Sequence, residues 1–270
     1  NFLQTVYNLV DMVIVGQYVG SAGLSAVSMG GEVLMFFTFA CLCFVSAGQL
    51  LISQFVGRKD YASVKKSIGM MFTMMLVLSI FITIISIPLA RPILRILNVP
   101  DEAMQGAVDY TTVCLMGVIF IFGYNCVGAI MRGMGDSKRP LVFVSIAAVM
   151  NIFLDLLFVK AMSMGPGGAA LATIISQAFS FIVAMIYLYR NREAFGFDFK
   201  LKSFAIDRNI FIRELKLGIP MMLQFSAINI SMMFVNAFIN QYGVTAMAVT
   251  AIGNKLGNIA NIVTQSLHTA

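Results

Sequence analysis

The chain consists mainly of long apolar runs separated by short polar segments, and this pattern leaves few folds open to it. The runs reach about 20 residues, the length that a helix needs to cross a bilayer, and they lack the strict alternation of a membrane β-strand. Only 11% of the 270 residues are charged, against about 25% in a typical soluble domain. The sequence therefore predicts an all-α integral membrane protein, a polytopic helical bundle.

Seven apolar runs predict membrane helices, and an eighth run begins near residue 245. The expected helices are about 1–20, 24–55, 68–90, 107–131, 141–161, 169–189 and 216–240. Pro88 and Pro92 are expected to end or kink the third helix. A short interfacial helix is expected in the basic segment 57–66, and a tight connection at 165–168.

The basic residues indicate which ends of the helices face the cytoplasm. The loops after the second, fourth and sixth helices, with their flanks, hold four, three and seven Lys or Arg, whereas the opposite side holds only Arg91, Arg95 and Lys160. The positive-inside rule then places those three loops and the N-terminus in the cytoplasm. The same rule and contacts with lipid headgroups account for the net charge of +6, so no nucleic-acid partner is expected.

A carboxylate inside an apolar run is the strongest functional signal. Asp155 follows Asn151 by four residues, so the two stack on one face of a helix. An ionisable group at mid-membrane costs about 2.5–3.5 kcal/mol on insertion scales and marks a functional site by default. The alternative is a helix–helix hydrogen bond that only fixes packing.

A second carboxylate, Asp11, lies in the first apolar run. Gln4, Tyr7 and Asp11 are spaced i, i+3 and i+7 and form one polar stripe. We expect the faces that carry Asp11 and Asp155 to meet, where they would accept a proton or bind Na⁺ with oxygen ligands from Asp, Asn and Thr. No resident cofactor is expected, because the Na⁺ or H⁺ would be a coupling ion that binds and leaves during transport.

Two further charges in apolar runs suggest a contact between two halves of the protein. The spacing from Gly20 to Gly30 before Glu32 is repeated from Gly243 to Gly253 before Lys255, a weak sign of a parallel internal repeat. A gate pair between Glu32 and Lys255 is a hypothesis that follows from this match. Its alternatives are a Glu near a helix end and a Lys that reaches the membrane interface.

Other classes of site find little support. The four cysteines fall in apolar runs without a zinc spacing and are expected to be buried. The Gly133-Met134-Gly135 segment follows a membrane helix rather than a strand, so it is not a phosphate loop. The sequence contains one His and no catalytic arrangement, so no enzyme activity is expected.

Four stretches together resemble the multidrug and toxic compound extrusion (MATE) family, and they span nearly all of the chain. They are Val10 to Gly16, Arg132 to Pro140, Asn151 through Thr173, and Gly218-Ile219-Pro220. The resemblance implies twelve helices in two six-helix lobes around a central cavity. It also implies that the protein exports organic cations or drugs in exchange for Na⁺ or H⁺.

The resemblance assigns roles and boundaries to this chain. Asp11, Asn151, Asp155 and Thr173 match the cation site of the first lobe, and Gln4, Tyr7 and Asn125 match its cavity. The expected domains are a first lobe at 1–189, a cytoplasmic linker at 190–215, and the start of a second lobe at 216–270, with helix 7 and part of helix 8. The protein is expected to be a monomer in a bacterial cytoplasmic membrane, and the chain a piece of a longer protein.

The sequence departs from the family in two ways. Residues 224–230 of helix 7 carry no carboxylate, unlike some members, and the chain stops within helix 8.

Three other functions are considered. The first alternative is a lipid-linked oligosaccharide flippase of the same superfamily, which a basic cavity would favour. The others are a membrane scaffold or sensor, whose buried carboxylates would be dispensable, and an intramembrane enzyme.

Overall fold

The structure is a computed structural model that describes residues 13–240. These residues belong to two compact units, one that runs to Gly218 and one that begins at Ile219. Residues 13–19 are helical. The further helices are α2 (Ser21–Gly57), α3 (Tyr61–Ile96), α4 (Asp101–Met116), α5 (Val118–Gly133), α6 (Lys138–Asp155), the π-helical turn η1 (Leu156–Ala161), α7 (Gly165–Arg190), the 3₁₀ turn η2 (Leu201–Phe204) and α8 (Arg208–Asn240).

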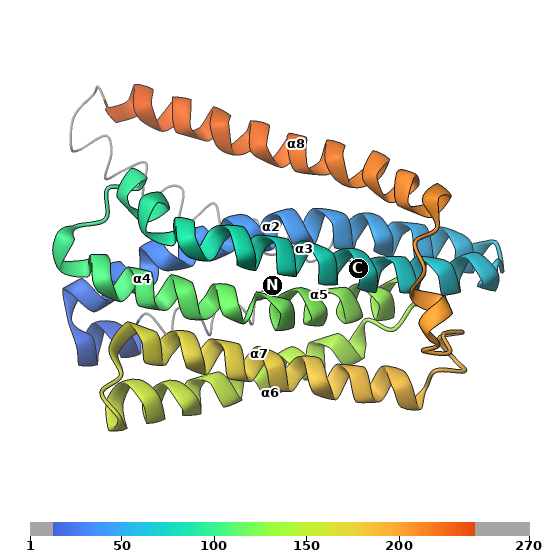
Figure 1. Cartoon of the computed structure of the whole chain (residues 1–270), viewed down its shortest axis with the longest axis horizontal. Helices are drawn as coiled ribbons and strands as arrows, with labels where there is room; N and C mark the ends of the chain where they lie inside the picture. Colours follow the sequence, from blue (N-terminus) through green and yellow to red (C-terminus); the bar gives the residue numbers. More distant parts are fainter. Residues whose placement is uncertain (1–12, 241–270) are drawn as a thin grey trace. The chain divides into compact units, whose positions relative to one another are not determined.

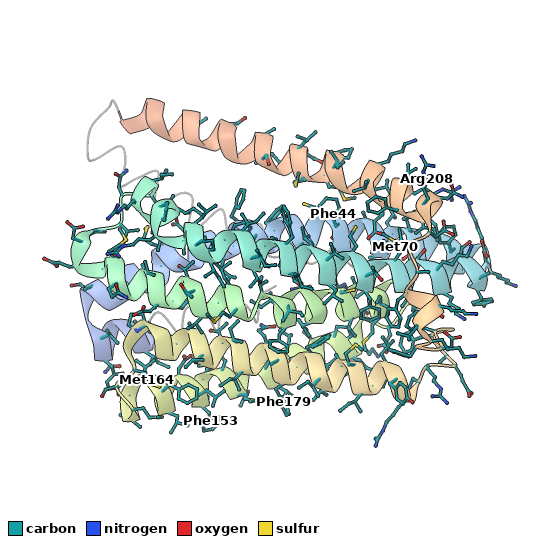
Figure 2. All side chains as sticks on the ribbon, in the orientation of Figure 1. Phe44, Met70, Phe153, Met164, Phe179 and Arg208 are labelled. Carbon is teal, nitrogen blue, oxygen red and sulfur yellow. The ribbon has the colours of Figure 1, made fainter. Side chains whose placement is uncertain are left out.

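Helices α2 to α7 form the bundle of the first unit. Four of them are long and apolar enough to cross a membrane, and the bent pair of α4 and α5 supplies a fifth candidate span among the described residues. Helix α2 packs against α3, α4 and α5, and α7 packs against α4, α5 and α6. The outer faces carry large apolar side chains such as Phe153 and Phe179 (Figure 2), which are 69% and 41% exposed and suit contact with lipid.

The connections that follow α2, α5 and α7 lie at the same end of this bundle (Figure 1). These are the three loops that are rich in Lys and Arg. Their common location agrees with the prediction that the three basic loops share one side of the membrane. That this side is the cytoplasm remains a prediction.

Helix α3 differs from the prediction at both ends. The expected interfacial helix is instead the first turns of α3, because Asp60 caps that helix by accepting a hydrogen bond from the backbone N–H of Ser63 at 3.1 Å. At the other end α3 continues through Pro88 and Pro92 to Ile96, so these prolines do not end it, and the expected kink stays a prediction. A proline removes the bond to the carbonyl four residues earlier, and membrane helices accommodate this loss through their neighbours.

The predicted helix at 107–131 is in fact two helices. Helix α4 begins six residues earlier, at Asp101, where Asp101 and Glu102 occupy the first turn and interact favourably with the helix dipole. The α4–α5 pair bends by 49° at Gly117. A side chain at Gly117 would overlap Ile174 of α7, so the bend lies at a close contact between the pair and α7.

Two other helices start earlier than predicted. The expected connection at 165–168 is the first turn of α7, where Pro166 fits because the first N–H groups of a helix have no partner within it. Helix α8 starts at Arg208 rather than near 216, since the Asp207 carboxylate accepts hydrogen bonds from the N–H groups of Asn209 and Ile210.

The segment between α7 and α8 is attached to α3 over much of its length. Lys65 pairs with Asp198 at 2.7 Å and Lys66 pairs with Asp207 at 3.0 Å. The bonded Lys65 ammonium holds the pKa of Asp198 well below its usual range. Phe197 is buried, and the aromatic rings around it are Phe72, Phe199 and Phe204.

The Gly30-Gly31 pair in α2 suggests close packing or a bend, and the structure shows a close contact with α4 at Gly30 but not at Gly31. A Cβ atom at Gly30 would lie 2.7 Å from Cδ1 of Tyr110 and 2.9 Å from Oγ1 of Thr111, whereas one at Gly31 would meet nothing within 4 Å. Of these two neighbouring glycines, only Gly30 lies where a side chain would overlap another helix.

We expect Gly30→Ala to destabilise the protein and Gly31→Ala to stabilise it. The first change overpacks the α2–α4 contact, at a cost of about 1–3 kcal/mol. The second gains up to about 1 kcal/mol of helix propensity without a clash. Thermal unfolding of the detergent-solubilised variants measures both changes, and equal shifts in Tm would contradict the close contact at Gly30.

Candidate cation site

Asn151 and Asp155 lie on the inner face of α6, as the sequence predicts. Their side chains are 2% and 0% exposed, while Phe153 between them is 69% exposed. Helix α6 ends at Asp155, and the π-helical turn η1 follows at once. Such turns are rare and occur often at functional sites. The buried carboxylate therefore stands at an irregularity in the helix.

Thr173 contributes from α7, which packs against α6 and η1. Its side chain is 9% exposed. Within the part of the chain that the structure describes, neither the Thr173 hydroxyl nor the amide atoms of Asn151 have a hydrogen-bond partner. A buried polar group without a partner is costly, so these two side chains have the capacity to bind a ligand.

The first helix reaches the same region through its described residues. Ile14 and Val15 pack in one apolar cluster with Val159 of η1 and Ala169 and Ala170 of α7. These partners follow Asp155 and precede Thr173 by a few residues. The Lys160 ammonium also lies over the ring of Tyr18, 5.3 Å from its centroid.

The remaining predicted residues of the first helix lie outside the described residues. Asp11, Gln4 and Tyr7 all precede residue 13. Asp11 comes three residues before Ile14, so its assignment to the cation site stays a prediction that the packing of Ile14 and Val15 supports.

Asn125 is half-buried on α5 and bonds to its own helix. Its Nδ2 atom donates to the backbone oxygen of Ile121 at 2.8 Å. Its assignment to the substrate cavity stays a prediction. Glu32 is exposed on α2, and Lys255 lies outside the described residues, so the gate pair is likewise untested.

Several buried polar side chains were not predicted from the sequence. On α7 these are Ser176, Gln177 and Ser180, on α4 Thr111, and on α8 Glu214. Gln177 follows Thr173 by four residues, so the spacing that linked Asn151 to Asp155 would also have found it. Glu214 was assigned to a linker, where a charge needs no explanation.

The four cysteines are buried, as predicted. The Cys41 thiol lies 3.4 Å from the Met75 sulfur in the core. Among the residues that the structure describes, no three His, Cys, Asp or Glu side chains are placed to hold a metal. The candidate set instead combines one carboxylate with amide and hydroxyl oxygens, a donor set suited to hard cations.

The sequence and the structure both resemble known membrane transporters. Residues 1–157 match the family model MatE. The probable multidrug resistance protein YpnP of Bacillus subtilis is 29% identical over 274 residues, covering 100% of this chain and 60% of that protein. The chain thus spans about three fifths of the length of this relative.

Two of the similar solved structures represent different conformations of a transporter. One is the outward-facing conformation of a multidrug resistance MATE family transporter of the MOP superfamily, with a TM-score of 0.85, 26% identity, and coverage of 96% of this chain and 57% of that one. The other is an inward-facing conformation, with a TM-score of 0.78, 27% identity, and coverage of 90% and 55%.

Proposed function

This chain belongs to the MatE family, and we propose that it forms the first lobe, the linker and the start of the second lobe of a cation-coupled multidrug antiporter. The complete protein would export organic cations or drugs across a bacterial cytoplasmic membrane as a monomer, with its N-terminus in the cytoplasm. One observation supports this most directly. Asn151, Asp155 and Thr173 are all buried, and they lie on two helices that pack together, in a chain whose relative is named as a multidrug resistance protein.

The chemistry of these side chains suits the exchange of a small cation. Asp155 supplies the charge, and Asn151 and Thr173 supply oxygen atoms that have no other described partner. Carboxylate, amide and hydroxyl oxygens are ligands for Na⁺, and the carboxylate alone accepts H⁺. Asp11 is expected to complete the site from the first helix.

Exchange requires that the cation prefer one conformation over another. A ligand shifts an equilibrium only by the difference between its affinities for the two states. The similar proteins solved in outward-facing and inward-facing conformations support such a pair of states. We propose that cation binding changes the packing of the first helix on η1 and α7, where Ile14 and Val159 meet, and that this change expels the drug.

Transport in inside-out vesicles tests the proposal. The complete protein would be assayed for uptake of a fluorescent organic cation under an imposed Na⁺ gradient and, separately, under a pH gradient. Uptake driven by one gradient would establish antiport and identify the ion. Absence of uptake under both gradients would reject the proposal.

Thr173→Val distinguishes the two coupling ions. Valine keeps the shape of threonine but removes the oxygen, so a Na⁺ site loses a ligand while a proton site keeps its acceptor. We expect a raised Na⁺ concentration for half-maximal transport if Na⁺ is the ion, and little change in a pH-driven protein. Thr112→Val on α4, outside the site, is the matched control, and equal effects in both variants would contradict a ligand role for Thr173.

A further inference from the structure

The first turns of α8 pack against the bundle of the first unit through one face. Ile210 and Glu214 are 6% and 1% exposed, and Gly218 is buried. A Cβ atom at Gly218 would lie 2.6 Å from Cδ1 of Phe44 on α2. Because these positions are four residues apart, they share one side of the helix. Figure 2 marks Arg208, where this part of α8 begins, and Phe44.

Glu214 is the charged residue on this packed face, and its carboxylate has no partner among the described residues. In the region that the structure describes, neither of its oxygens accepts or donates a hydrogen bond, and it forms no salt bridge. Arg213 and Lys216 beside it on α8 are exposed.

The groups on the neighbouring helices do not compensate its charge. A titratable group close enough to interact with Glu214 is the buried thiol of Cys126 on α5, which in turn lies near Cys41 on α2. On α5, Arg132 donates to the Gln49 side chain of α2 at 3.1 Å. On α3, the basic residues Lys65 and Lys66 pair with the linker carboxylates.

An ionised carboxylate is unstable in this environment. Removal of an ion from water costs several kcal/mol, which an ion pair or hydrogen bonds must offset. Glu214 has neither, and burial raises its pKa to about 8. It precedes the span predicted at 216–240, near the end of the bundle that carries the basic loops. The neutral acid is therefore the form that fits between α8 and α5.

We propose that Glu214 is a proton-binding site, separate from the one formed by Asn151, Asp155 and Thr173, which holds its proton while the first turns of α8 pack on the bundle. When these turns separate from α5, the carboxyl group meets water and releases the proton. The proposal concerns the start of α8 alone and does not depend on drug export.

The sequence offers a place where this movement is possible. The boundary between the two compact units falls after Gly218, and Pro220 follows inside α8. Proline cannot donate to the carbonyl of Lys216, so the helix is weakened at this point. The turns from Arg208 to Gly218 can therefore move as a segment that ends at this weakened point of α8.

The sign of the pH effect follows from the raised pKa. The packed state holds the proton more tightly than the separated state, in which the carboxyl group titrates near its ordinary value of 4.5. Packing of these turns is strongest below that value and weakens as the pH rises to about 8, where the packed form also loses its proton.

Difference infrared spectroscopy tests the protonation directly. Spectra of the complete protein at about pH 6 and about pH 10, on either side of the raised pKa, should show loss of the carbonyl stretch of a buried carboxylic acid. Glu214→Gln should remove this band, whereas Glu193→Gln, which changes an exposed carboxylate, should keep it. A spectrum of Glu214→Gln identical to that of the parent would overturn the proposal.

Thiol labelling tests the link to packing. In a background without the native cysteines, Ile210→Cys is on the packed face and Ile212→Cys, at 38% exposure, is the control for thiol chemistry in the same turn. The labelling rate at position 210, divided by the rate at position 212, should rise with pH in the protein with Glu214 and stay constant in Glu214→Gln. A ratio that rises equally in both would overturn the release step. Neither readout measures transport, so failure here is distinct from failure of the proposed antiport.

Discussion

Gradient-driven transport is expected to be lost in Asp155→Asn, down to the level of vesicles without the protein. Asparagine keeps the size of the side chain and removes the charge that a cation must neutralise. Asp155 is fully buried and shares its face of α6 with Asn151, so water cannot replace the missing carboxylate. The same vesicle assay measures the effect under both gradients.

A matched change elsewhere separates this effect from a loss of charge in general. Asp109 is exposed on α4, and its carboxylate accepts a hydrogen bond from Gln105 in the same helix. Asp109→Asn should transport as the parent protein does. Full activity of Asp155→Asn, with both variants correctly inserted, would show that coupling resides elsewhere in the complete protein.

Phe197→Ala is expected to release the linker from α3. Phe197 is 1% exposed, and its ring lies 4.8 Å from Phe199 and 5.3 Å from Phe204, centroid to centroid. Truncation of a buried Phe costs about 3–5 kcal/mol. Since each 1.4 kcal/mol is a factor of ten, the open form should become at least about a hundredfold more populated.

Limited trypsin digestion measures this release, because the linker contains Arg192, Lys200 and Lys202. Cleavage follows the population of the open form when opening is fast. Leu201→Ala is the control, as Leu201 is 92% exposed. Lys65→Ala should have only a small effect, because a partly exposed ion pair contributes about 0.2–1 kcal/mol. If Lys65→Ala accelerated cleavage more than Phe197→Ala, the aromatic contacts would not be what holds the linker.

The helical class and the inner face of α6 could be predicted from the sequence, because both follow from the helical period and the cost of polar groups in lipid. Asn151 and Asp155 are both buried as the i, i+4 spacing requires. The family resemblance is confirmed by the match over residues 1–157. The cation-site assignment itself still awaits a test.

The errors came from residues whose effect depends on neighbouring helices. Pro88 and Pro92 do not end α3, and a helix that looks continuous in the sequence breaks at Gly117, beside Ile174 of another helix. The residues around the two prolines and around Gly117 carry no local pattern that reveals these contacts with other helices. The early start of α8 is different, since Asp207 is a recognisable N-cap. With that cap identified, Glu214 would have been placed on a helix face.

The attachment of the linker to α3 determines how far the chain after α7 can move away from the bundle. The 17 residues from 191 through 207 separate α7 from α8, and fully extended they would reach roughly 55–60 Å. Yet Asp207, the last of them, is held by Lys66, and α8 begins at the next residue. The segment is therefore not a free tether. The start of α8 is therefore anchored to α3. Movement of the chain beyond Gly218 requires either that α8 bend or that the linker detach from α3.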